Sequence, residues 1–162
     1  MNMTRWHAIT LRGVAAAAAV MALFGCAAPG TVVPQQSTLA QVRDRVGLPT
    51  DVRFDANGDE LWEYAGGPSG TETYLIRGGR DGRVKEVTQL LTLDRFAEVE
   101  VGKTTKARVR DWLGRPSDMR QLGSGLVWEW RVLINPELGH LAVRFDENGI
   151  VREKMVLTDP QT

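Results

Sequence analysis

Apolar and polar residues alternate in several short segments of the chain, as they do in half-buried β-strands. In residues 126–134 every second side chain is apolar, which places one face of the segment against a core. The same period of two marks residues 74–76 in the first half of the chain and residues 141–145 in the second. The sequences GGRDGR and DENG follow these segments and predict hairpin turns. Both halves should therefore contain antiparallel strands.

Two other segments carry the period of a helix. Leu39, Val42 and Val46 fall on one helical face, and Thr38 stands three residues before Gln41, which is the spacing of a capping box. A glycine and then a proline follow this helical segment, and the same pair follows a second one, so both helices should end there. The two pairs are Gly47 with Pro49 and Gly114 with Pro116.

The chain contains an internal repeat. Residues 42–53 match residues 109–120 at seven of twelve positions, where average residue usage would give about one. The match continues at an offset of 66 or 67 through the aromatic strand and the turn after it. We predict two tandem units, residues 38–91 and residues 92–158, followed by a tail at 159–162. One helix and an antiparallel meander in each unit predict an α+β fold of two helix-plus-antiparallel-sheet repeats.

The two predicted units differ at their start. Leu93, Phe96 and Val99 recur at three-residue spacing and predict a short extra helix ahead of the second unit. At the same offset the first unit has only the sequence AAPGTVVPQQS, which is rich in proline, glycine and small polar residues. We therefore predict that residues 26–37 form a flexible tether without a leading helix.

The first 25 residues have the order of a secretory signal peptide. Two arginines and no acidic residue accompany an apolar run from Val14 to Phe24. Eleven apolar residues in a helix would span only about 17 Å, which is too short for a hydrocarbon core of about 30 Å. We therefore predict that residues 1–25 are a cleaved signal peptide and not a membrane-spanning anchor.

The end of this signal, LFGC at residues 23–26, resembles the lipobox of bacterial lipoproteins. The resemblance implies that Cys26, the only cysteine of the chain, carries diacylglycerol and palmitate and becomes the first mature residue. Several acyl chains, at about 0.8 kcal/mol per buried methylene, would hold the protein at a membrane. Residue 27 is alanine and not the aspartate that retains many lipoproteins at the inner membrane, which implies the outer membrane, with the folded domain in the periplasm. An ordinary signal peptide with an incidental cysteine is the alternative.

The second unit resembles the SmpA/OmlA domain of the BamE family of outer-membrane assembly lipoproteins. The shared pattern is a Gly-x-Thr segment, an LGxP helix end, an aromatic strand and an FDxxGxV turn. It is carried by Gly102, Thr104, Leu113, Gly114, Pro116, Trp128, Phe145, Asp146, Gly149 and Val151. The first unit matches more loosely, because Gln35 stands where the first glycine is expected. Two such units in tandem also resemble the fold of β-lactamase inhibitor protein, whose paired repeats form a concave surface.

These resemblances imply a non-catalytic lipoprotein that binds envelope proteins, among them subunits of the β-barrel assembly machinery. Its role would be to support the assembly of β-barrel outer-membrane proteins or envelope integrity. An inhibitor that blocks a secreted hydrolase with its concave sheet is the alternative. The chain has 20 basic and 20 acidic residues, and such a balance argues against nucleic acid or anionic lipid as the main partner.

Aromatic residues and arginines are the candidate partner-binding positions. They are Trp62, Tyr64, Trp128, Trp130, Arg43 and Arg110. Aromatic residues are common both in interfaces and in cores, so on strands that face helices we expect a core role first and a partner-binding sheet face as the alternative. The arginines belong to an Arg-Asp pair repeated in both helices, for which we expect a structural role ahead of recognition.

No motif predicts a catalytic or metal site. The GKTT sequence at residues 102–105 lacks the glycine five residues earlier that a phosphate-binding loop needs. His140 has no cysteine nearby, and the acidic turns at residues 55–60 and 146–149 lack calcium-loop spacing. We therefore predict no enzymatic activity, no cofactor and no metal.

Overall fold

The computed structural model describes residues 28–67, 70–134 and 137–158. Within these ranges the chain forms eight strands and three α-helices, and the strands make two antiparallel sheets of four. The predicted signal peptide, Cys26 and the tail lie outside the described residues. None of the helices in the described ranges has the length and apolar character of a membrane span.

Both sheets are simple meanders with the same strand order. The first consists of β1 (Asp51–Phe54), β2 (Glu60–Gly66), β3 (Glu72–Gly78) and β4 (Val84–Gln89). The second consists of β5 (Asp118–Leu122), β6 (Gly125–Ile134), β7 (Glu137–Phe145) and β8 (Val151–Thr158). The helices are α1 (Leu39–Val46), α2 (Leu93–Ala97) and α3 (Lys106–Leu113), and a 3-10 turn, η1 (Pro29–Thr31), precedes them.

The α+β class predicted from the sequence is wrong, because the structure is mainly β. Its helices have only eight, five and eight residues, whereas the two four-stranded sheets carry most of the ordered chain. Neither β1 nor β5 is among the strands predicted from the sequence. Both lie at a sheet edge, with side chains that are partly or fully exposed. β1 has only four residues and its alternating Val52 and Phe54 remain exposed, whereas β5 has no apolar alternation.

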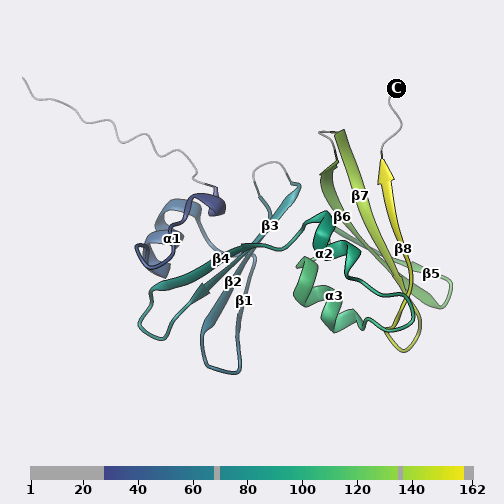
Figure 1. Ribbon diagram of the computed structural model, residues 1–162, viewed down its shortest axis with the longest axis horizontal. Helices are drawn as coiled ribbons and strands as arrows, with labels where there is room; N and C mark the ends of the chain where they lie inside the picture. The colour runs from purple at the N-terminus through teal and green to yellow at the C-terminus, as the bar shows by residue number, and fades with distance from the viewer. Residues whose placement is uncertain (1–27, 68–69, 135–136, 159–162) are drawn as a thin grey trace, which may run out of the picture.

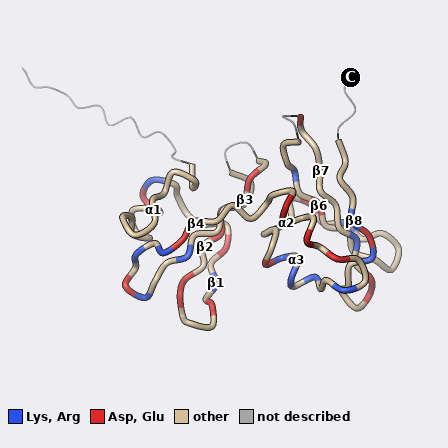
Figure 2. Tube along the Cα trace, viewed as in Figure 1, with Lys and Arg blue, Asp and Glu red and all other residues tan. Residues whose placement is uncertain are grey.

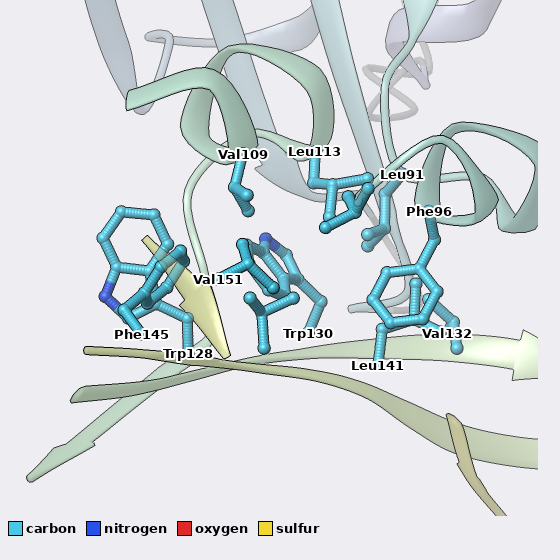
Figure 3. Close-up of a cluster of buried hydrophobic side chains, with 12 residues drawn as sticks. Leu91, Phe96, Val109, Leu113, Trp128, Trp130, Val132, Leu141, Phe145 and Val151 are labelled. Atoms are coloured by element: carbon cyan, nitrogen blue, oxygen red, sulfur yellow. The ribbon is translucent and has the colours of Figure 1, made fainter. Parts of the chain in front are cut away.

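The elements stack in four layers (Figure 1). α1 packs on one face of the first sheet, and α2 and α3 pack on one face of the second. The end of α3 also contacts the other face of the first sheet, so this helix lies between the sheets. Two separate apolar cores result, one under α1 and a larger one under α2 and α3 (Figure 3). No helix in the described ranges covers the outer face of the second sheet, called its open face below, and Leu133 and Leu157 are exposed on it.

The two longer helices begin and end as their sequences predict. The capping box of α1 is confirmed, since Gln41 N donates to Thr38 Oγ1 at 3.2 Å and Thr38 N donates to Gln41 Oε1 at 3.0 Å. Its C-cap is Gly47, at φ +98°. α3 has Thr105 as its N-cap and Gly114, at φ +77°, as its C-cap. The short helix expected over Leu93 to Val99 is also confirmed, as α2.

The described part of the predicted flexible tether, residues 28–37, is packed on the first sheet, so that prediction is wrong for these residues. Pro29 and Ser37 are buried, and Val32 contacts the first core. Gln35 N donates to Val84 O at 2.8 Å, and Val84 N donates to Ser37 O at 2.9 Å. The segment therefore begins the folded unit.

The same hydrogen bonds recur 67 residues later in the second unit. Gly102 N donates to Val151 O at 2.7 Å, and Val151 N donates to Thr104 O at 2.9 Å. η1 thus stands where α2 stands in the second unit. Gln35 lies at φ +65°, in the left-handed region that its counterpart Gly102 adopts at +79°. Among the described residues Gln35 is the one non-glycine with a positive φ.

Replacing Gln35 by glycine should therefore stabilise the protein. The left-handed conformation costs a residue with a Cβ about 1 to 2 kcal/mol, and the greater freedom of glycine in the unfolded chain offsets part of the gain. We expect the free energy of unfolding, measured by urea denaturation, to rise by about 0.5 to 1 kcal/mol. The reciprocal Gly102→Gln variant should lose about 1 kcal/mol. A destabilised Gln35→Gly protein would contradict this explanation.

Candidate partner-binding groove

Tyr64 and Trp130 occupy equivalent positions on β2 and β6, and each holds the end of a helix. Tyr64 Oη donates to the carbonyl of Gly47 at 3.1 Å, and Trp130 Nε1 donates to the carbonyl of Gly114 at 3.2 Å. These carbonyls belong to the C-caps, where the helix itself supplies no partner. Figure 3 shows the Trp130 ring beneath α3. Burial raises the pKa of Tyr64 to about 12, so its hydroxyl stays a donor.

The other two aromatic candidates also contribute to the cores. Trp128 packs edge to face against Phe145, with the ring centroids 5.0 Å apart, and against Trp130, at 6.1 Å. Trp62 is half-buried beside the first core, and its Nε1 donates to Glu60 Oε2 at 2.7 Å. All four aromatic residues thus pack within or against the cores of the free chain, and their partner-binding role stays a prediction.

The two predicted arginines, equivalent in the repeat, have different surroundings. Arg110 on α3 donates from Nη1 to Glu63 Oε2 at 2.5 Å and from Nη2 to Asp51 Oδ2 at 3.0 Å. Its counterpart Arg43 on α1 is exposed and forms no ion pair in the described part of the chain. Arg110 therefore joins the two halves of the molecule, and Arg43 remains available at the surface.

Glu63 is the centre of the ionic cluster that joins the two halves. Its side chain is 0% exposed, and it accepts hydrogen bonds from Arg110, from Arg53 Nη1 at 3.1 Å and from the backbone N of Arg115 at 2.6 Å. Burying a carboxylate is costly unless it is paired in this way. Figure 2 shows the basic positions of α3 beside acidic positions of the first sheet. The cluster therefore fixes how α3 sits on that sheet.

Beside this cluster a groove of about 320 Å³ opens between the two sheets. The first half contributes Thr50, Ala65, Gly66, Gly70 and Thr73, the second contributes Arg115, Pro116, Ser117, Trp130 and Arg131, and Leu91 joins them. Trp130, Leu91 and Pro116 are buried and form an apolar base, whereas Arg115 and Arg131 are exposed. The groove thus combines an apolar base with a basic rim.

The chemistry of the groove favours binding of an anion. Neither Arg115 nor Arg131 forms a side-chain ion pair among the described residues. Arg131 Nη1 lies 3.9 Å from the position that a Cβ on Gly70 would take, so its guanidinium reaches across to the first half. A guanidinium group matches the planar, two-oxygen geometry of a carboxylate, and the groove has two such groups at its rim. The lining contains no histidine, aspartate or glutamate to transfer a proton.

This groove could not be predicted from the sequence. Its residues come from five separate segments, and they meet only because α3 docks on the first sheet. Glu63 follows Trp62 as Glu129 follows Trp128, so the sequence does not distinguish the two glutamates, and Glu129 is not in the cluster. Across the described residues no group of three His, Cys, Asp or Glu side chains is placed to hold a metal ion.

Comparison of the chain with protein-family models gives no match, and comparison with curated protein sequences gives none. Two solved structures are similar at low levels. A DUF4309 family protein from Bacillus subtilis shares 13% identity over 80% of this chain and 83% of its own, with a TM-score of 0.31. A candidate β-lactamase inhibitor protein from Streptococcus mutans shares 12% over 74% and 82%, with a TM-score of 0.27. The comparisons give no support to the BamE resemblance.

Proposed function

We propose that this chain is a lipid-anchored, non-catalytic protein-binding module of the bacterial envelope, and that its groove receives a carboxylate-bearing segment of the partner. The observation that carries the proposal is the groove itself. It brings two arginines, neither of which forms a side-chain ion pair with the described residues, to the same groove as a buried indole and a leucine. A peptide carboxylate can bind the rim while the neighbouring side chain fills the apolar base.

The position of the anchor supports action close to a membrane. Only residues 27 and 28 separate Cys26 from Pro29, which is packed on the first sheet. The chain reaches at most about 3.6 Å per residue, so a lipid on Cys26 would hold the folded body within about 15 Å of its attachment point. Confinement of this kind raises the effective concentration of membrane partners, so a modest groove affinity would suffice.

Reversal of the rim charges tests the groove. A photo-reactive residue at Ser117 should cross-link to the partner in intact cells, and Arg115→Glu with Arg131→Glu should reduce the product on the order of tenfold or more. Arg83→Glu with Lys106→Glu makes the same change in net charge at exposed positions outside the groove, and should leave the product unchanged. An equal loss in both double variants, or in neither, would rule out a carboxylate site at Arg115 and Arg131.

The identity of the cross-linked protein distinguishes a role in outer-membrane assembly from inhibition of a hydrolase. Subunits of a β-barrel assembly machine would support the role in outer-membrane assembly or envelope integrity that the BamE resemblance implies. A single soluble hydrolase that the protein inhibits would support the inhibitor function. The inhibitor is kept as the second candidate because it would bind through a sheet face, and the open face of the second sheet exposes the apolar residues Leu133, Met155 and Leu157, which suit a protein interface.

A further inference from the structure

The contact between the two halves uses a set of residues that the repeat has duplicated. On the first sheet, Asp51 pairs across strands with Glu63, and Arg53 contacts both carboxylates. Arg110, near the end of α3, then binds the same two carboxylates, and the backbone N of Arg115 donates to Glu63. A sheet face with two acids and one arginine thus accepts a helix end that carries another arginine.

The second sheet carries the same three residue types at the equivalent positions of its open face. Asp118 pairs across strands with Glu129, in the register of Asp51 with Glu63. Arg120 contacts both carboxylates, Asp118 at 3.3 Å and Glu129 more closely. No helix of the described chain covers this face. This ion-paired group has two carboxylates and one arginine, and it lacks the second arginine that Arg110 supplies on the first sheet.

The matching helix end is also present in the chain, on α1. Arg43 corresponds to Arg110, Gly47 to Gly114 and Leu48 to Arg115. In this copy the helix end meets no second sheet in the described part of the chain: Arg43 is exposed without an ion pair there, and a Cβ on Gly47 would have no atom within 4 Å. Leu48 is 76% exposed.

We propose that the protein associates with a second copy of itself, head to tail, by docking the α1 end of one copy on the open face of the second sheet of the other. Arg43 then binds Asp118 and Glu129 as Arg110 binds Asp51 and Glu63. The backbone N of Leu48 meets Glu129, and the side chain of Leu48 leaves water. Because the two surfaces differ, the contact is heterologous, and each added copy presents a new acceptor face.

Disulfide trapping tests this geometry. Within the chain, a Cβ on Gly114 would lie 3.4 Å from Thr73 Cβ, which is close to disulfide spacing. The equivalent intermolecular pair is Gly47 on α1 and His140 on β7. Full-length copies carrying Gly47→Cys, mixed with copies carrying His140→Cys, should form a mixed disulfide on oxidation. Neither variant alone should form one through these positions, and the parent chain reports any background from Cys26.

Charge variants make the test specific. Added to the Gly47→Cys copy, Arg43→Glu should lower the yield of mixed disulfide on the order of tenfold, and the matched Arg45→Glu on the same helix should not. Glu129→Arg in the other copy should restore trapping with Arg43→Glu. Circular dichroism checks that each variant is folded. Folded variants that give no mixed disulfide, or the same yield with Arg43→Glu and Arg45→Glu, would overturn the proposal.

Discussion

Replacing Glu63 by glutamine should lower the free energy of unfolding by about 3 kcal/mol, which is a large loss for a single substitution. The substitution keeps the shape of the side chain but removes a charge that is 0% exposed and meets two guanidinium groups. Removing one partner of a buried ion pair costs about 3 to 5 kcal/mol. Arg53 and Arg110 are 27% and 23% exposed, so water recovers part of that cost. Urea denaturation followed by tryptophan fluorescence measures the change.

The repeat supplies the matched control. Glu129 occupies the position of Glu63 in the second sheet, but its partner Arg120 is 59% exposed. An exposed ion pair contributes about 0 to 1 kcal/mol, so Glu129→Gln should change the stability by less than 1 kcal/mol. Similar losses in the two variants would show that the cluster around Glu63 does not hold the two halves together.

The repeat, the strands with an apolar face and the helix ends could all be predicted from the sequence, because each depends on neighbours within one unit. The capping box of Thr38 with Gln41 is a three-residue pattern, and the alternation from Trp128 to Ile134 depends only on which face meets the core. Gly47 and Gly114 mark helix ends because the chain must take a positive φ there. Features of this kind depend on residues that are close together in the sequence.

The features that were missed depend on what each unit docks against. Residues 28–37 have a tether-like composition, yet they pack because Val84 supplies backbone hydrogen bonds from the far end of the unit. Arg43 and Arg110 have the same sequence surroundings, but only Arg110 contacts the sheet of the other unit. The groove likewise joins Arg115 and Arg131 to residues of the first half. The sequence repeat predicts equal roles for its two copies. Their roles differ because α3 docks on the sheet of the other unit and α1 does not.

Gly114→Ala should cost about 3 kcal/mol, well above the cost of the same change at Gly47. Both glycines are C-caps with positive φ, and an alanine there is strained by about 1 to 2 kcal/mol. At Gly114 the new Cβ would also lie 2.5 Å from Cγ2 of Thr73 and 3.1 Å from Oε1 of Glu63. Thr73 is 1% exposed, so it cannot move aside cheaply, and overpacking adds about 1 to 3 kcal/mol. At Gly47 nothing lies within 4 Å.

A second substitution separates the collision from the strain. Thr73→Ser removes the Cγ2 atom and keeps the hydroxyl, so in the Gly114→Ala background it should recover about half of the loss. In the native background it should cost about 1 kcal/mol for the lost methyl group. Urea denaturation of the four proteins in this cycle gives the coupling directly. If Gly47→Ala proves as damaging as Gly114→Ala, or if the two substitutions are additive, then α3 is not packed tightly on the first sheet at Gly114.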